Sequence, residues 1–97
     1  MHIISKKPLR EFWEKHSGTE QSLKDWWTIT SKTSWANFPS IKQTFNTTDV
    51  YGSCYIFDVG GNKVRLIAKI RFDKQTLYVR RVLTHPEYDK GAWKNDC

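Results

Sequence analysis

The sequence lacks the long apolar stretches that membrane spans and secretion signals require. No apolar run approaches the ~20 residues of a membrane-spanning helix. The first residues, Met-His-Ile-Ile-Ser-Lys-Lys-Pro-Leu, contain only a very short apolar stretch and no signal-peptide core. These absences predict a protein without membrane contact.

Cysteine is scarce as well. The two cysteines, Cys54 in an expected strand and Cys97 at the last position, do not make a disulfide framework. Their scarcity predicts a reducing compartment, the cytoplasm.

Residue patterns for metal, cofactor and nucleophile chemistry are weak. His2, His16 and His85 lie far apart, with no Cys/His cluster beside them. Gly60-Gly61-Asn62 lacks the spacing of a phosphate-binding loop and is most simply a turn. No serine or cysteine triad is recognisable. We therefore expect no metal and no cofactor.

Aromatic and basic residues are abundant. The 97 residues, which we expect to form one domain (1–97), are only 38% hydrophobic, but 14% are aromatic and five are tryptophan. Residues 61–81 hold seven basic residues and one acid, a surplus equal to the net charge of +6 of the whole chain. The pI near 9.5 therefore reflects one basic segment, which favours nucleic acid over a membrane as partner.

This basic segment alternates as a β-hairpin around a turn at Asp73-Lys74-Gln75. On the first strand an apolar face is expected opposite a basic face interrupted by Ile67. On the second strand the pattern predicts that Arg80 faces outward beside Arg65, with Arg81 an exception on the core side. On the first strand, the expected core face is Val64, Leu66, Ala68, Ile70 and Phe72, and the expected open face is Lys63, Arg65, Lys69 and Arg71. On the second strand, the expected core face is Leu77, Val79, Arg81 and Leu83, and the expected open face is Tyr78, Arg80, Val82 and Thr84.

Three helices are expected in the first half, after a short strand at residues 1–4. Ser5 is the predicted N-cap of the first, with Pro8 in its first turn, and Ser17-Gly18 its end. Ser17-Gly18-Thr19-Glu20 matches a capping box for the second, and Asn37 with Pro39 begins the third. Their apolar stripes are Leu9, Phe12, Trp13, His16; Leu23, Trp26, Trp27, Thr30; and Phe38, Ile41, Phe45.

The second half is expected to be mainly strand. Val50–Val59 is predicted as one strand, followed by the hairpin and by a helical turn that Thr84-His85-Pro86-Glu87 begins. The order β-α-α-α-β-β-β plus a terminal turn predicts an α+β domain, a mainly antiparallel sheet with the N-terminal helices on one face.

A group of side chains suited to RNA cleavage follows the basic strand. His85, Tyr88 and Asp89 are spaced to share one side of a helical turn. RNA carries its own nucleophile, the ribose 2′-hydroxyl, so cleavage needs proton carriers and cations. Imidazole exchanges protons near neutral pH, which favours His85, with Tyr88 or Lys69 as a second carrier. Arg65 and Arg80 would hold the phosphate.

Simpler interpretations of these residues exist. Exposed basic residues are common on a solvated sheet face, His85 taken alone is most simply a capping or packing residue, and Tyr88 and Trp93 could cover the end of the sheet. The basic residues are concentrated on one strand face, and this favours phosphate binding over an ordinary solvated surface.

Three segments resemble the HigB toxins of bacterial type II toxin–antitoxin operons, in the RelE-like superfamily. They are Met-His-Ile-Ile-Ser, Val59-Gly60-Gly61-Asn62-Lys63-Val64-Arg65-Leu66-Ile67, and Val79-Arg80 with Thr84-His85-Pro86-Glu87-Tyr88-Asp89-Lys90. The resemblance covers nearly the whole chain. It implies a RelE-like fold and a small mRNA interferase that cuts mRNA, commonly on the translating ribosome, to stop translation and growth.

The resemblance also implies partners and site residues. The partner would be a helix-turn-helix antitoxin of HigA type, and operator DNA would be bound only through the complex of the two. Arg65, Arg80, His85 and Tyr88 would be catalytic. The candidate RNA contacts are Asn62, Lys63, Lys69, Arg71, Asp89 and Trp93.

Two other functions use the same basic face. A non-catalytic module could bind RNA or the ribosome without cleaving it, and His85 and Tyr88 distinguish a nuclease from such a binder. A protein-interaction domain could instead dock a partner on its exposed aromatic residues.

Overall fold

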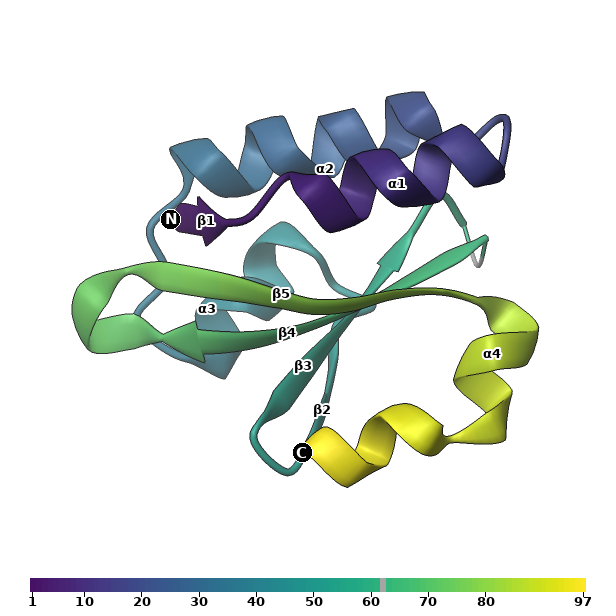
Figure 1. Ribbon diagram of the computed structural model, residues 1–97. Helices are drawn as coiled ribbons and strands as arrows, with labels where there is room; N and C mark the ends of the chain where they lie inside the picture. Colours follow the sequence, from purple (N-terminus) through teal and green to yellow (C-terminus); the bar gives the residue numbers. More distant parts are fainter. Residues whose placement is uncertain (62) are drawn as a thin grey trace.

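A five-stranded sheet organises the chain (Figure 1), in a computed structural model that describes residues 1–61 and 63–97. The strand order is β1-β5-β4-β3-β2, in which β1 is parallel to β5 and the other pairs are antiparallel. This confirms the predicted α+β class. The elements are β1 (His2–Ile4), α1 (Lys7–Lys15), α2 (Glu20–Lys32), α3 (Phe38–Thr44), β2 (Asp49–Tyr51), β3 (Cys54–Val59), β4 (Val64–Arg71), β5 (Thr76–Thr84), α4 (His85–Lys90) and two short 3-10 helices, η1 (Phe72–Lys74) and η2 (Ala92–Asp96).

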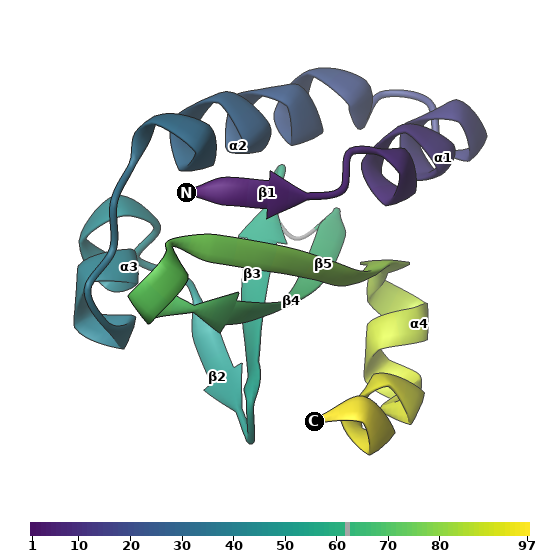
Figure 2. The ribbon, with the colours of Figure 1, turned by 60° about the vertical axis from the view of Figure 1, so that its left-hand side comes forward.

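The main core lies under α1 and α2, which both cover one face of the sheet (Figure 2). Leu9 and Phe12 of α1 and Leu23 and Trp26 of α2 are buried, as their spacing predicts. They pack against the alternating apolar residues of the central strands, Phe57, Val64, Leu66, Ala68 and Leu77 among them. In the part of the chain that is described, the helices are too short and too polar to cross a membrane.

Two of the three predicted helix starts were wrong. Helix α1 begins two residues after Ser5, with Lys6 at the N-cap and Pro8 in the first turn, where a missing N–H costs nothing. Thr19, not Ser17, is the N-cap of α2, and its hydroxyl donates to the carbonyl of His16 (2.7 Å) rather than closing a capping box. The third start is confirmed: the Asn37 side chain accepts from the backbone N–H of Ser40 (3.0 Å).

The predicted strand over Val50–Val59 is instead a hairpin of β2 and β3. Gly52 turns the chain with φ +56°, a left-handed conformation that glycine adopts without steric cost. A Cβ atom at Gly52 would also lie 2.5 Å from the carbonyl oxygen of Cys97. The turn is therefore shaped both by its own backbone and by the chain end that packs on it.

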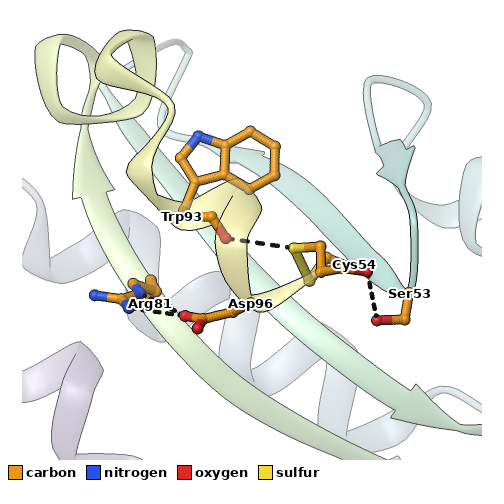
Figure 3. The surroundings of a disulfide bond; sticks show 6 residues. Ser53, Cys54, Arg81, Trp93 and Asp96 are labelled. Atoms are coloured by element: carbon orange, nitrogen blue, oxygen red, sulfur yellow. Dashed lines mark hydrogen bonds and ion pairs between the residues drawn. A yellow bond between two sulfur atoms is a disulfide. The ribbon is translucent and has the colours of Figure 1, made fainter.

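The last residues fold back over the face of the sheet opposite α1 and α2 and bring Cys97 to β3, although the scarcity of cysteine predicted no disulfide framework. Cys54 on β3 and Cys97 form a disulfide across 43 residues of sequence (Figure 3). The backbone N–H and the hydroxyl of Ser53 both donate to the carbonyl of Cys97 (3.2 Å each). Sequence spacing could not predict this bond, because the two cysteines meet only when η2 lies on the sheet.

We expect the substitution Cys97→Ser to lower the free energy of unfolding by about 2–4 kcal/mol, because it removes a cross-link that restricts the unfolded chain. Urea denaturation under non-reducing conditions measures this. Wild type treated with dithiothreitol is the matched control and should unfold with the variant. Equal stability of oxidised wild type and variant would show that noncovalent packing alone holds the segment.

Candidate functional site

Strand β4 separates apolar from basic side chains as predicted. Val64, Leu66 and Ala68 face the helices and are buried. Arg65 and Lys69 occupy the alternate positions with Ile67 between them, on the face that we call the distal face because it lies away from α1 and α2. Ile67 is buried there in a second apolar cluster with Cys54, Ile56 and Trp93. Ile67 thus interrupts the row of basic residues because its side chain is needed for packing.

A β-bulge on β5 overturns the predicted orientation of the last arginines. Ala68 pairs with Val79 but Ile67 pairs with Arg81, so Arg80 is an extra residue without a partner on β4. The bulge shifts the alternation by one residue. Val82 therefore packs in the main core, and Leu83 packs in the second cluster. Arg65 lies opposite Leu83, not beside Arg80, and Arg81 lies on the distal face.

Arg65 is held by neighbours on two elements. Its guanidinium lies 2.7 Å from a carboxylate oxygen of Asp58, and the two side chains are only 15% and 19% exposed. The guanidinium also lies over the ring of Tyr88, 5.2 Å from its centroid. Asp58 was missed in the sequence, although a tight turn after Val59 sets it opposite Arg65. A phosphate at Arg65 would have to share it with Asp58.

Tyr88 is sandwiched between Arg65 and Trp93. The Tyr88 and Trp93 rings are stacked, with centroids 5.1 Å apart, and the indole N–H of Trp93 donates to the carbonyl of Tyr88 (2.9 Å). Trp93 is only 4% exposed. The structure therefore brings Arg65 and Tyr88 together as expected, but it buries Trp93 as packing support and leaves little of its ring for an RNA base.

His85 stands at the start of α4 and is accessible. Its Nδ1 lies 2.9 Å from a carboxylate oxygen of Asp89, one turn further on, and both side chains are about half exposed or more. Asp89 can hold the imidazole with Nδ1 protonated and Nε2 free. The predicted proximity of His85 and Asp89 is confirmed.

The start of α4 is fixed by the predicted capping box. The Thr84 hydroxyl accepts from the backbone N–H of Glu87, and Glu87 accepts from the backbone N–H of Thr84 (2.9 Å). Two hydrogen bonds lower the pKa of Glu87 below its ordinary value. The larger effect comes from the backbone N–H of Thr84 and the smaller from the Thr84 hydroxyl (3.0 Å). The box sets the direction in which α4 leaves β5, and with it the position of His85.

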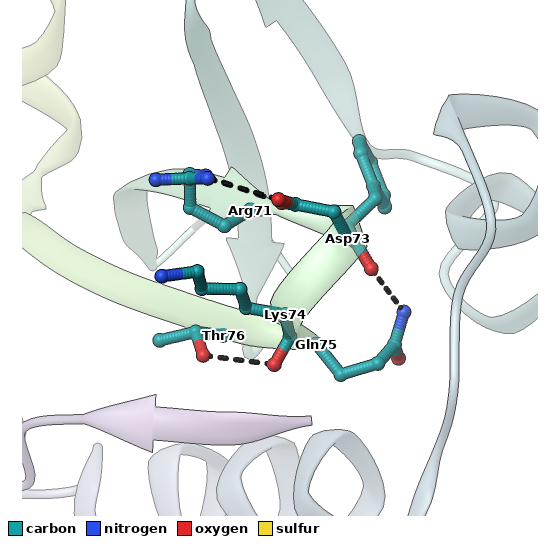
Figure 4. A network of polar contacts seen from close by, with 6 residues as sticks. Arg71, Asp73, Lys74, Gln75 and Thr76 are labelled. Atoms are coloured by element: carbon teal, nitrogen blue, oxygen red, sulfur yellow. Dashed lines mark hydrogen bonds and ion pairs between the residues drawn. The ribbon is translucent and has the colours of Figure 1, made fainter.

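The other residues that were predicted to contact RNA differ in their neighbours and in their exposure. Arg71 pairs with Asp73 at the η1 turn (2.9 Å), which raises the pKa of Arg71 (Figure 4). Lys69 stays on the distal face beside Tyr78, and Lys63 is exposed. Asn62 lies outside the described residues. Arg81 pairs with Asp96 of η2 (2.7 Å), and this contact lowers the pKa of Asp96 (Figure 3).

The basic groups thus fall in two places. Arg65 with Tyr88, and Lys69, lie on the distal face, whereas Arg80 lines a groove against α1 together with Glu87. Arg81 belongs to both places, because it borders the groove while its guanidinium pairs with Asp96 on the distal face. Within residues 1–61 and 63–97, no three His, Cys, Asp or Glu side chains are grouped as metal ligands.

Comparisons with known proteins identify relatives over most of the chain. Residues 19–91 match the family model described as HigB_toxin, RelE-like toxic component of a toxin–antitoxin system. The chain is 34% identical over 92 residues to the mRNA interferase toxin HigB of Escherichia coli K12, covering 92% of this chain and 88% of the relative. The mRNA interferase HigB of Escherichia coli O6:H1 is 32% identical over 93 residues, covering 93% and 90%.

We expect the stabilising effect of Glu87 to disappear in acid. A carboxyl whose pKa is lowered by folding stabilises the protein above its unfolded pKa, ~4.3 for glutamate, and this contribution is lost as the pH falls through the folded pKa. The melting temperature of wild type should exceed that of Glu87→Gln at pH 7, and the difference should shrink toward pH 3. Glu14→Gln, on an exposed position of α1, should show no such convergence.

Proposed function

This chain belongs to the HigB family of RelE-like toxins from toxin–antitoxin systems, and from that premise we propose the site and the chemistry by which it cleaves mRNA. The protein is a toxin and an endoribonuclease, as the resemblance in its sequence implied. The observation that carries this conclusion is the relationship to mRNA interferases over 92% of the chain. That span includes the basic strands and α4.

The proposed site is the N-terminal turn of α4 with the adjacent part of β4. His85, held by Asp89, takes the proton from the ribose 2′-hydroxyl through its free Nε2. The 2′-oxygen then attacks the adjacent phosphorus, the bond to the 5′-oxygen breaks, and that oxygen takes a proton from Tyr88 or Lys69, the second proton carrier. Solvent returns a proton to that carrier and removes the one on His85. The products would be a 2′,3′-cyclic phosphate and a free 5′-hydroxyl. No step calls for a metal ion or a cofactor.

Tyr88 is proposed as the second polar group of this site. Its ring is fixed between Trp93 and the Arg65 guanidinium, so its hydroxyl has little freedom. Arg65 would act in two ways, by orienting Tyr88 and by placing positive charge near the phosphate. Lys69 and Arg71 of β4, and Lys63 just before it, would supply further positive charge for the RNA backbone, with Asp89 as a polar group beside His85. Asn62, which lies outside the described residues, is proposed as an RNA contact from its place in the sequence alone.

Membership of the family shows what kind of partner the protein has. As the toxic component of a toxin–antitoxin system, the protein has an antitoxin. We infer that this antitoxin is a helix-turn-helix protein of HigA type, that the complex binds operator DNA, and that cleavage takes place on the translating ribosome. The cytoplasm is the proposed location, because mRNA is translated there. The Cys54–Cys97 bond would be open to reduction in that compartment.

His85→Ala should lower the rate of mRNA cleavage by about 10²–10⁴, the usual contribution of a general acid or base. Purified protein acting on a translated mRNA, with cleavage followed by primer extension, measures it. His2→Ala, on the exposed strand β1, is the matched control and should cleave like wild type. The assignment is wrong if Arg65→Ala, Arg80→Ala and His85→Ala all arrest growth as wild type does when induced.

Replacing the ribose at a mapped cleavage site by 2′-deoxyribose should abolish cleavage there and leave other sites intact, because the nucleophile is removed. The ends of the products, mapped with and without ribosomes, show whether translation is required, and free RNA treated in EDTA shows whether a divalent cation is needed. Cleavage that persists at the deoxy position would contradict the 2′-hydroxyl mechanism. RNA that is bound but never cut would support a non-catalytic RNA-binding function instead.

A further inference from the structure

A groove of about 280 Å³ lies between α1, β5 and the start of α4. Its volume is just below the roughly 300 Å³ at which small-molecule sites begin, which is room for one nucleobase. Among the described residues that line it are Glu11, Phe12, Lys15 and His16 from α1 and its C-cap, and Arg80 and Val82 from β5. Arg65, His85 and Tyr88 are not among its lining residues, so the groove is distinct from the proposed catalytic group.

Arg80 is directed to this groove by the bulge on β5. Its side chain is exposed and makes no hydrogen bond or ion pair with another residue in the described parts of the chain, although its charge helps to lower the pKa of Asp96. Its neighbour Arg81, by contrast, is engaged by Asp96. A guanidinium can donate two parallel N–H hydrogen bonds to two oxygens of a phosphate group. Bulges commonly reorient a side chain next to a functional site.

One wall of the groove is aromatic. The rings of Phe12 and His16 lie with centroids 4.3 Å apart and planes tilted by 31°. Phe12 belongs to the buried core and backs the imidazole of His16, which is half-buried and is the ring that a base can reach. Bases in single-stranded RNA are commonly bound on such planar side chains. Val82 adds apolar surface to the same groove.

The groove also contains carboxylates, which a site for phosphate alone would not favour. Glu87 uses one oxygen to accept from the backbone and the hydroxyl of Thr84. Glu11 is exposed and makes no hydrogen bond with another described residue, so both of its oxygens can accept. Guanine is the RNA base with two adjacent donors, N1–H and the N2 amino group, on its Watson–Crick edge. A free carboxylate is their bidentate complement.

We propose that this groove is a subsite for one guanine nucleotide of the RNA strand, adjacent to the cleaved bond. Arg80, with Lys15 nearby, holds the phosphate, the imidazole of His16 supports the base, and Glu11 accepts from N1 and N2. The inference rests on the proposed ribonuclease function and makes Glu11 a specificity-determining residue. It adds to that function a preference for guanine beside the cleavage site.

The test measures binding without cleavage, by fluorescence anisotropy with oligonucleotides of 2′-deoxyuridine. One probe carries a central deoxyguanosine, and the other carries deoxyinosine, which lacks only the N2 amino group. Wild type should bind the guanine probe about 5-fold more tightly, the value of one hydrogen bond. Glu11→Ala should bind both probes equally. Glu14→Ala, one turn along α1 and outside the groove, should keep the preference.

Arg80→Gln should weaken the binding of both probes alike and reduce the slope of log affinity against log salt by about 0.7, the effect of one lost phosphate contact on a single strand. Equal binding of the two probes by wild type, or a guanine preference that survives Glu11→Ala, would overturn the proposal. Cleavage by wild type with no guanine preference removes the subsite and leaves the nuclease. A preference abolished by Glu11→Ala in a protein that cuts no RNA supports the subsite and removes the catalytic proposal.

Discussion

The burial of Trp93 between the sheet and α4 is the contact on which the proposed catalytic residues depend. Its ring fills the second apolar cluster with Ile56, Ile67 and Cys54, and its other face stacks on Tyr88. Tyr88 in turn lies against Arg65, which is paired with Asp58. A chain of contacts thus runs from the disulfide on β3 to the turn that carries His85. In a helix of only six residues, such tertiary contacts supply most of the order that its own hydrogen bonds cannot.

The bulge on β5 distributes the basic residues between two surfaces. Without the extra residue, Arg80 would face the same side as Arg65, and Arg81 would enter the main core. With it, Arg81 reaches Asp96 on the distal face and Arg80 is left at the groove beside α1. One inserted residue avoids burying a charge and places positive charge on both sides of α4. An RNA strand that passes the end of β5 could contact both.

Most of the secondary structure could be read from local patterns. The 3.6-residue stripes of α1 and α2, the Asn37 and Thr84 caps and the alternation of β4 each depend on neighbours a few residues away. The errors have specific physical causes. Ser5 and Ser17 matched capping patterns without being used as caps. Gly52 divided the strand-like segment Val50–Val59 into two strands, because its positive φ allowed a turn that the pattern alone did not require.

The sequence by itself determined most of the helices and strands, the apolar and basic faces of β4, the capping box of α4 and the motifs that mark the family, because each follows from short-range periodicity or from residue identity. Only the tertiary structure decided the partner of Arg65, the orientation of Arg80, the burial of Trp93 and the union of Cys54 with Cys97. These depend on strand register and on how the last residues pack on the sheet. Such contacts join residues far apart in the chain, and no local pattern specifies them.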